Sequence, residues 1–349
     1  MRTALPRPGL RDVRPYEAPQ LDVPVRLNTN ECPFPLPDGF RDDLARAVRE
    51  LPLNRYPRRE ADELRARLAA INGHPVEGTW AANGSNEVLL QILLAHGGPG
   101  RGVVVFEPTY ALHSRLAWMV NGEVLPVHLD PPWRIGSRDV ERALALEPHV
   151  VFVCSPNNPT GNAQPVEAVA GLASGGDALV VVDEAYVEFG GRSAAGLIAR
   201  HPNVVVVRTF SKAFALAGAR IGYCLAAPEV VEDLRRVRLP YHLSALTQVA
   251  GLVALDHRDD ALAILDAVRA HRDRLSDALP PMGVEAFPSD ANFVLFRPPK
   301  PAGEVWSGLL ERGVLVRDFT ELVPGCLRVT AGTAEETDAF LSALEEVLR

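Results

Sequence analysis

Short apolar runs alternate with helix-like segments through the first two thirds of the chain. The runs "RGVVVFEP", "HVVFVCSP", "ALVVVDEAY" and "NVVVVRTF" are rich in valine and show no alternation of polar residues. Such runs are typical of strands that are covered on both faces. Helical spacing follows at 85–96, 110–121 and 165–174, and "GEVLPVHL" indicates a further strand. Strands that alternate with helices predict an α/β fold with a mainly parallel sheet.

The two ends of the chain follow other patterns. The N-terminal part is irregular and rich in proline, yet too apolar for a free tail, so we expect a packed arm. Residues 41–72 indicate helix interrupted by "LPLNRYP", and residues 228–239 and 246–279 predict long helices. The remaining strands, in "DANFVLF", "VLVRDF" and "CLRVTAGT", are shorter and are followed by a last helix. This end of the chain therefore predicts a smaller α+β domain.

These patterns predict three parts of the chain. Residues 1–40 form an N-terminal arm and part of the small domain, residues 41–250 form a large domain, and residues 251–349 form the C-terminal small domain. The length of 349 residues allows one large domain or two and is enough to bury a sizeable core.

Charge and hydropathy exclude several classes of partner. The formal net charge of −8 argues against a nucleic acid or an anionic membrane surface as the main partner. No apolar run approaches the roughly 20 residues that span a bilayer. The first residues lack the apolar region of a secretory signal. We therefore expect a cytoplasmic protein that binds neither membranes nor nucleic acids.

The cysteines point in the same direction. Cys32, Cys154, Cys224 and Cys326 are far apart, and no CxxC motif is present. We expect buried free thiols, as in a cytoplasmic protein, rather than disulfides or metal ligands. No metal site is predicted.

Polar residues cluster directly after three of the apolar runs. "HVVFVCSP" leads into Asn157 and Asn158, "ALVVVDEAY" ends with Asp183 and Tyr186, and "NVVVVRTF" leads into Ser211 and Lys212. Each cluster alone is as typical of a turn or a helix cap. Because ligands of open α/β sheets bind at the carboxyl ends of the strands, three such clusters together predict a binding site.

The motif "NGSNE" adds a candidate anion site. Gly84, Ser85 and Asn86 precede an amphipathic helix, whose free N–H groups and dipole attract anions. The same motif also fits simple helix capping, in which Glu87 suits the first turn. Arg220 follows Lys212 by eight residues and could bind the same anion.

Lys212 lies among apolar and small residues, which suits a reactive amine. In a low-dielectric site near a cation such as Arg220, the pKa of a lysine falls from about 10.4, and the neutral amine can form a Schiff base with a carbonyl. An aldehyde cofactor with a phosphate and a ring nitrogen would use the surrounding groups. Asp183 would pair with the ring nitrogen, Tyr186 and Asn158 with the ring hydroxyl, and Tyr110 would stack on the ring. The alternative for Lys212 is a surface lysine with a buried stem.

These motifs resemble a known family. "SPNNPTG", "VVDEAYVEF" and "RTFSKAFALAGARIGY" are similar to the signatures of fold-type I, pyridoxal-phosphate-dependent aminotransferases. With "LNTNECPFP", "LNRYP", "EPTY" and "LPYHLS" in the same order, the chain most resembles the histidinol-phosphate aminotransferases of histidine biosynthesis. The resemblance implies a large cofactor-binding domain with a mainly parallel, seven-stranded sheet flanked by helices, and a smaller α+β domain. The implied reaction converts L-histidinol phosphate and 2-oxoglutarate to imidazole-acetol phosphate and L-glutamate.

The resemblance also implies roles for the cofactor-site residues. Lys212 is the Schiff-base lysine and the proton carrier, Asp183 pairs with the pyridine nitrogen, and Tyr110 stacks on the ring. Asn158 and Tyr186 hold the ring oxygen. The residues implied to hold the cofactor phosphate are Ser85, Asn86, Thr209, Ser211 and Arg220.

Further residues are implied to contact the substrates. Arg328 is similar to the arginine that binds the α-carboxylate of glutamate, and Arg317 to the one that faces the substrate phosphate. Tyr56 would reach the site of a neighbouring subunit, which implies a homodimer, and Tyr16 would close the pocket. Arg317 and Arg328 also stand in alternating strand patterns, so either could face solvent. The chain departs from the family pattern at Cys32, Phe34 and Asn86. Phe34 lacks a hydroxyl near the entry arm, which leaves the contacts of that arm open.

Three other functions compete with this one. The first is an aromatic amino-acid aminotransferase of the same family. "LPYHLS" argues against it, because Tyr241, His242 and Ser244 would form a polar wall suited to a phosphorylated substrate. The second is a phosphothreonine decarboxylase on the same scaffold. The third is a non-catalytic binding protein, against which the intact Lys212 and Asp183 argue.

Overall fold

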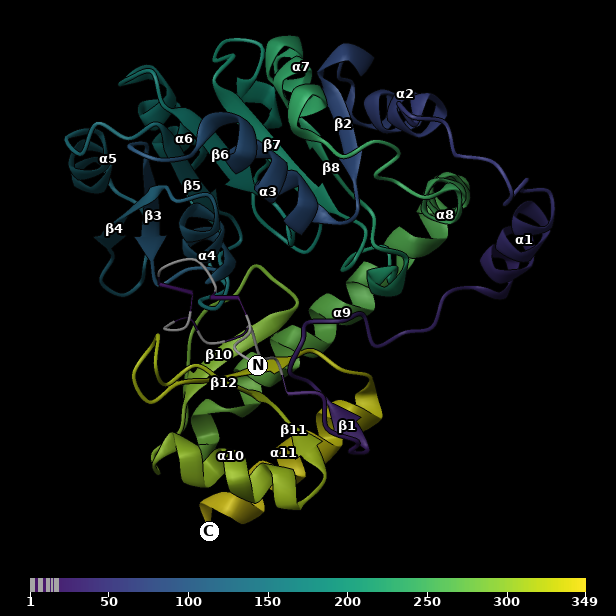
Figure 1. Ribbon diagram of the computed structural model, residues 1–349. Helices are drawn as coiled ribbons and strands as arrows, with labels where there is room; N and C mark the ends of the chain where they lie inside the picture. Colours follow the sequence, from purple (N-terminus) through teal and green to yellow (C-terminus); the bar gives the residue numbers. More distant parts are fainter. Residues whose placement is uncertain (1–3, 6–8, 11–12, 14, 16–18) are drawn as a thin grey trace.

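A seven-stranded sheet forms the centre of the larger part of the molecule (Figure 1). The computed structural model describes residues 4–5, 9–10, 13, 15 and 19–349. The strand order is β2-β8-β7-β6-β5-β3-β4, and β8 is antiparallel to both of its neighbours. The strands are β2 Thr79–Ala82, β3 Gly102–Glu107, β4 Glu123–His128, β5 Val150–Cys154, β6 Leu179–Asp183, β7 Val204–Thr209 and β8 Gly222–Leu225.

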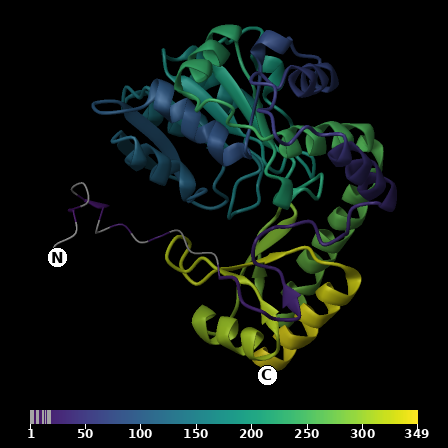
Figure 2. The same ribbon diagram turned by 45° about the vertical axis from the view of Figure 1, so that its right-hand side comes forward.

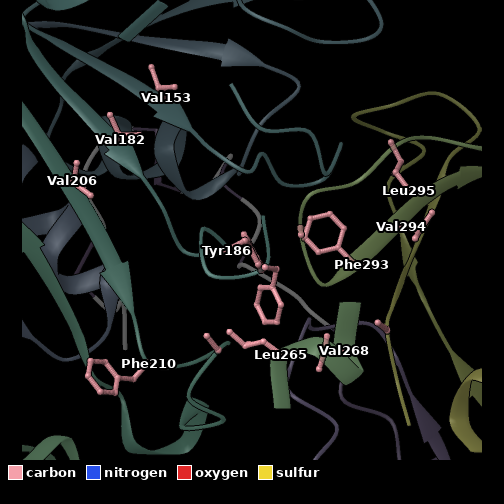
Figure 3. Packing of buried hydrophobic residues seen from close by; sticks show 14 of the residues in the cluster. Val153, Val182, Tyr186, Val206, Phe210, Leu265, Val268, Phe293, Val294 and Leu295 are labelled. Atoms are coloured by element: carbon pink, nitrogen blue, oxygen red, sulfur yellow. The ribbon is translucent and has the colours of Figure 1, made fainter. Parts of the chain in front are cut away.

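Helices cover both faces of this sheet, which is why its central strands are apolar throughout. Val180, Val182, Val204 and Val206 point to one face, and the alternating Val181 points to the other. The helices on the first face are α2 Asp62–Asn72, α5 Ser137–Leu144, α6 Val166–Ser174 and α8 Ala245–Asp256. The helices on the second face are α3 Ser85–His96, α4 Leu112–Met119 and α7 Pro228–Val237. Figure 3 shows Val153, Val182 and Val206 on adjacent strands of the first face.

A smaller part contains a four-stranded antiparallel sheet in the order β12-β13-β10-β9. Helix α9 leads from the larger part to the smaller one (Figures 1 and 2). The strands are β9 Glu285–Ala286, β10 Phe293–Arg297, β12 Arg317–Asp318 and β13 Leu327–Thr330. The helices of this part are α9 Arg258–Ala278, α10 Ala302–Glu311 and α11 Ala334–Leu348. Short 3-10 turns lie at Val76–Gly78, Ala195–Leu197, Ala217–Ala219 and Pro280–Met282.

The N-terminal arm joins both parts. Its strand β1, Val25–Arg26, pairs in parallel with β11, Val314–Leu315, in the smaller part. After the arm, helix α1, Asp38–Arg49, packs against α8. Strand β1 thus links the N-terminal arm to the C-terminal part of the chain.

The architecture confirms the predicted fold class and corrects some of its details. The predicted helix at 246–279 is two helices, because His257 has a non-helical ψ of 24°. Its ring nitrogens lie 2.9 Å from a carboxylate oxygen of Asp43 and 3.2 Å from one of Asp260. Strands β2 and β8 and helix α5 were not predicted. The domain limits stay a prediction, and the predicted boundary between residues 250 and 251 falls within α8.

No helix among the described residues is both long enough and apolar enough to cross a bilayer.

Candidate active site

A cavity of about 430 Å³ lies where β5, β6 and β7 end, and residues of the arm and the smaller sheet close it. It collects nearly all of the predicted site residues. Those that line it are Ser85, Asn86, Tyr110, Asn158, Asp183, Tyr186, Thr209, Ser211, Lys212, Arg220, Arg317 and Arg328. Tyr16 lies outside the described residues, and Tyr56 does not line this cavity.

Lys212 directs its amine at the arm. Its Nζ donates a hydrogen bond to the carbonyl oxygen of Thr29 at 2.8 Å. Burial is the main cause that lowers the pKa of the amine to about 8; the positive charges of Arg328 and Arg220 contribute to this lowering, whereas the negative charge of Glu31 opposes it. The sequence suggested Arg220 as the cation, but Arg328 has the larger effect. The amine is therefore neutral in a substantial fraction of molecules near pH 8.

Asp183 presents a buried carboxylate to the cavity at the end of β6. Its side chain is held by the backbone N–H of Ala185, 3.2 Å from Oδ1, and by His113 Nε2, 3.2 Å from Oδ2. His113 is fully buried and stacks on Phe152, with ring centroids 4.6 Å apart and an interplanar angle of 7°. A buried carboxylate that faces a cavity suits a cationic N–H group, because burial without a positive partner is costly.

The start of α3 forms a cradle for an anion. Gly84 precedes the helix with a φ of 81°, and no side chain caps the first turn. A Cβ at Gly222 would lie 2.2 Å from Gly84 C and Ser85 N, and a Cβ at Gly84 would lie 2.6 Å from Arg220 Nη2. The two glycines therefore let β8, the helix start and the guanidinium approach one another closely. Free N–H groups, the helix dipole and Arg220 together make an anion site.

Two side chains from β7 and the loop after it extend this cradle. Ser211 Oγ accepts hydrogen bonds from Thr209 Oγ1 at 2.9 Å and from Arg220 Nη1 at 3.4 Å. The backbone N–H of Ser211 in turn donates to Thr209 Oγ1 at 3.1 Å. These bonds fix both hydroxyl groups beside the guanidinium and leave the hydroxyl hydrogen of Ser211 able to donate to an anion.

Arg328 is a buried residue of β13 that lines the cavity. Its guanidinium donates to the carbonyl oxygen of Asn28 at 2.7 Å and to Asn158 Oδ1. It lies over the rings of Phe293 and Phe319, 4.9 Å from each centroid. The alternative that Arg328 faces solvent is therefore wrong.

Arg317 lies on β12, where it pairs in register with Arg328 of the adjacent strand β13. It is half-buried and lines the cavity. Arg317 thus lines the cavity while staying partly exposed, and its role in substrate binding stays a prediction. The cavity is lined by two sets of cationic groups: Arg220 beside the start of α3, and this pair of arginines on the smaller sheet. It can accordingly hold two anionic groups at the same time.

The predicted polar wall is wrong within this chain. Tyr241 stacks on Tyr56 at 4.4 Å, and the ring of His242 stacks on Trp80 at 5.3 Å. The Ser244 hydroxyl accepts from Thr247 N at 3.0 Å and caps α8. All three side chains are engaged in packing or capping, and none lines the described cavity.

Sequence reasoning missed two contributors to the site. The arm segment 28–31 lines the cavity and supplies the partners of Lys212, Tyr186 and Arg328. In the sequence, "LNTNE" carries no signal beyond its place in a family motif. His113 was also missed, although it stands three positions after Tyr110 near the start of α4, where a helix can turn it toward the same strand ends.

Comparison with known proteins agrees with this geometry. The family model for aminotransferases of class I and II matches residues 23–344. The chain is 49% identical over 358 residues to the histidinol-phosphate aminotransferase of Frankia casuarinae, covering 98% of this chain and 90% of that protein. It is 49% identical over 355 residues to the enzyme of the same name from Streptomyces avermitilis, covering 98% and 96%. The crystal structure of histidinol-phosphate aminotransferase from Sinorhizobium meliloti in complex with pyridoxal-5'-phosphate is similar with a TM-score of 0.86 at 26% identity, covering 94% and 91%.

Proposed function

Because this chain belongs to the family of class I and II aminotransferases, we propose that its cavity transfers the amino group of L-histidinol phosphate to 2-oxoglutarate, with pyridoxal 5'-phosphate as cofactor. The products are imidazole-acetol phosphate and L-glutamate, and the pathway is histidine biosynthesis. The observation that carries this proposal is the cavity lined by Arg220, Arg317 and Arg328 together with a lysine of lowered pKa.

The residues present fit this cofactor. The cradle of Ser85, Asn86, Ser211 and Arg220 suits its phosphate, and the buried carboxylate of Asp183 suits its protonated ring nitrogen. When bound, pyridoxal phosphate withdraws electrons from the bond that loses a proton.

Residues of this chain must accept, hold and return the proton that the substrate loses. The amine of Lys212, with its pKa lowered to about 8, is basic enough to accept a proton and weak enough to return it near neutral pH. Asp183 would place its carboxylate beside the ring nitrogen, since His113 and the backbone N–H of Ala185 hold its oxygens in place.

The pair Arg317 and Arg328 fits the substrate anions. Histidinol phosphate carries a phosphate and no carboxylate, whereas glutamate carries two carboxylates. The same pocket must therefore bind the phosphate of histidinol phosphate in one half of the reaction and a carboxylate of glutamate in the other. The planar fork of a guanidinium can bind both phosphate and carboxylate through two parallel hydrogen bonds.

The Arg317→Ala variant should distinguish phosphorylated from aromatic amino donors. A lost charge-assisted contact costs roughly 1.5–3 kcal/mol, so kcat/KM for histidinol phosphate should fall at least about tenfold. Glutamate should also react more slowly, while phenylalanine should be nearly unaffected because its ring makes no ionic contact. Arg312→Ala removes an arginine outside the cavity, paired with Glu346, and serves as the control. Equal losses for histidinol phosphate and phenylalanine would make Arg317 structural.

Side-by-side kinetics of the unmutated enzyme test the proposal itself. Histidinol phosphate and phenylalanine are compared as donors to 2-oxoglutarate, and histidinol phosphate should give the higher kcat/KM. A preference for phenylalanine would establish the alternative, an aromatic amino-acid aminotransferase. Release of CO₂ from phosphothreonine, without transamination, would instead indicate a decarboxylase.

We further propose that the enzyme is a cytoplasmic homodimer. Exposed apolar side chains gather at the α1–α2 connection and around the start of α8, where Leu53, Tyr56 and Leu239 are 64%, 79% and 73% exposed. Tyr56 stacks on Tyr241 and does not line the cavity of its own chain. An exposed apolar surface of this kind is typical of an interface. The four free cysteines fit a reducing compartment.

Mixed dimers should reveal whether Tyr56 completes the neighbouring site. Tyr56→Phe and Lys212→Ala subunits are mixed in equal amounts after subunit exchange has been shown with tagged chains. Half of the dimers then carry one site with both residues intact, so roughly a quarter of all sites should work. Activity should exceed the mean of the two parents. Activity equal to that mean would place Tyr56 and Lys212 in the site of one chain.

A further inference from the structure

Asn30 is a buried residue of the arm at which every polar group is engaged. It is 1% exposed and has a φ of 55°, a left-handed conformation that asparagine tolerates. Its carbonyl oxygen accepts from Asn292 Nδ2 at 3.1 Å, and its N–H donates to Thr330 Oγ1 at 3.1 Å. Its side chain accepts from Thr330 Oγ1 at 3.1 Å and donates from Nδ2 to Tyr186 at 3.0 Å.

The Thr330 hydroxyl fixes which way the Asn30 amide points. Its oxygen accepts from the Asn30 N–H, and its single hydrogen is donated to Asn30 Oδ1. A flipped amide would turn its NH₂ group toward that hydrogen and leave the hydroxyl without an acceptor. The oxygen of the amide therefore faces Thr330, and the NH₂ group faces the phenol of Tyr186.

The phenol hydrogen of Tyr186 must consequently point in another direction than toward Asn30. Tyr186 uses its oxygen to accept from Asn30, which offers no acceptor on that side. Its ring packs edge-on against Phe293, with centroids 5.2 Å apart at 85°, and the two rings lie next to each other in Figure 3. None of the hydrogen bonds described for this structure takes the phenol hydrogen, and the phenol lines the cavity. The open direction for this hydrogen is the cavity.

We propose that Asn30 is a positioning residue, which makes Tyr186 a hydrogen-bond donor to the bound cofactor's ring oxygen. This inference rests on the proposed function, since that function places pyridoxal phosphate in the cavity. A neutral phenol donates without adding charge. Burial raises the pKa of Tyr186 to about 12, so the phenol keeps its hydrogen in the working pH range.

The pH titration of the bound cofactor's absorbance tests this arrangement. Asn30→Asp keeps the shape and tolerates the left-handed conformation, but its carboxylate only accepts hydrogen bonds and so takes the phenol hydrogen. Without the phenol as a donor to its ring oxygen, the cofactor should release its proton at higher pH, with a midpoint raised by about one unit. Tyr186→Phe should raise the midpoint by a similar amount.

Asn30→Gly separates orientation from packing. Glycine accepts a φ of 55° and removes every side-chain contact, but it leaves the phenol hydrogen free to point into the cavity. The midpoint should therefore move less in Asn30→Gly than in Asn30→Asp. If Asn30 only packs the arm in place, the order is reversed, since glycine removes more contacts, and the proposal is overturned.

A double variant separates the phenol from the new charge. If Asn30→Asp acts through Tyr186, adding it to Tyr186→Phe should give little further shift. Additive shifts would mean that the carboxylate acts directly through its charge, which contradicts the proposal. An unshifted Tyr186→Phe would also overturn it. Transamination of histidinol phosphate by the unmutated enzyme is measured separately and tests the proposed function alone.

Discussion

The Lys212→Ala variant is expected to lose transamination almost completely while keeping its fold. The amine is the covalent attachment point proposed for the cofactor and also the group proposed to carry the proton, so one substitution removes both roles. Proton transfer alone contributes about 10²–10⁴-fold, and the combined loss in kcat should reach at least about 10⁴-fold. Steady-state kinetics with histidinol phosphate and 2-oxoglutarate measure the loss.

Two controls make this result specific. Lys300→Ala changes a lysine whose Nζ donates to the Val347 carbonyl outside the cavity, and it should keep normal activity. An added primary amine such as ethylamine should restore part of the Lys212→Ala activity, because it can carry the proton. Near-normal turnover of Lys212→Ala without added amine would refute the assignment of this residue.

The Asp183→Asn variant should bind the cofactor but turn over slowly. A neutral amide cannot stabilise a protonated ring nitrogen as a carboxylate does, so the ring withdraws electrons less strongly. Loss of one electrostatic contact of this type costs about 10²–10³ in kcat, and a drop of this size is expected. Single-turnover kinetics of the loaded variant separate this step from cofactor binding.

A matched variant keeps the Asp183 result interpretable. Asp139→Asn changes a carboxylate that caps α5 through the Gly136 N–H and lies outside the cavity, so kcat should not change. If Asp183→Asn also keeps the kcat of the unmutated enzyme, Asp183 serves only to hold the end of β6 through Ala185 and His113.

The apolar runs predicted the central strands because burial on both faces leaves a clear signal in the sequence. β5, β6 and β7 carry that signal in their valines. β2, "TWAA", and β8, "GYCL", are four residues long and have no such run, so they could not be recognised. The break between α8 and α9 was also hidden, because His257 is held there by Asp43, which is distant in sequence.

The candidate site was predictable where polar or ionisable residues stand at or directly after the end of an apolar strand. Asp183, Ser211 and Lys212 were found in this way, because the carboxyl ends of parallel strands meet at one edge. The arm residues were missed because Asn30 finds its partner Thr330 only in the folded chain, 300 positions away. Periodicity reports local structure and contains no information on contacts of this range.

The pairing of β1 with β11 affects the order in which the chain can fold while the ribosome synthesises it. Val25 meets Val314, so the first strand to leave the ribosome has no partner until nearly the whole chain has been made. At about 5–20 residues per second, the arm waits for roughly 15 to 60 seconds. The large sheet can form during this interval, since its strands end at Leu225. The segment that supplies the carbonyl partner of Lys212 is thus among the first to be synthesised and the last to be fixed in place.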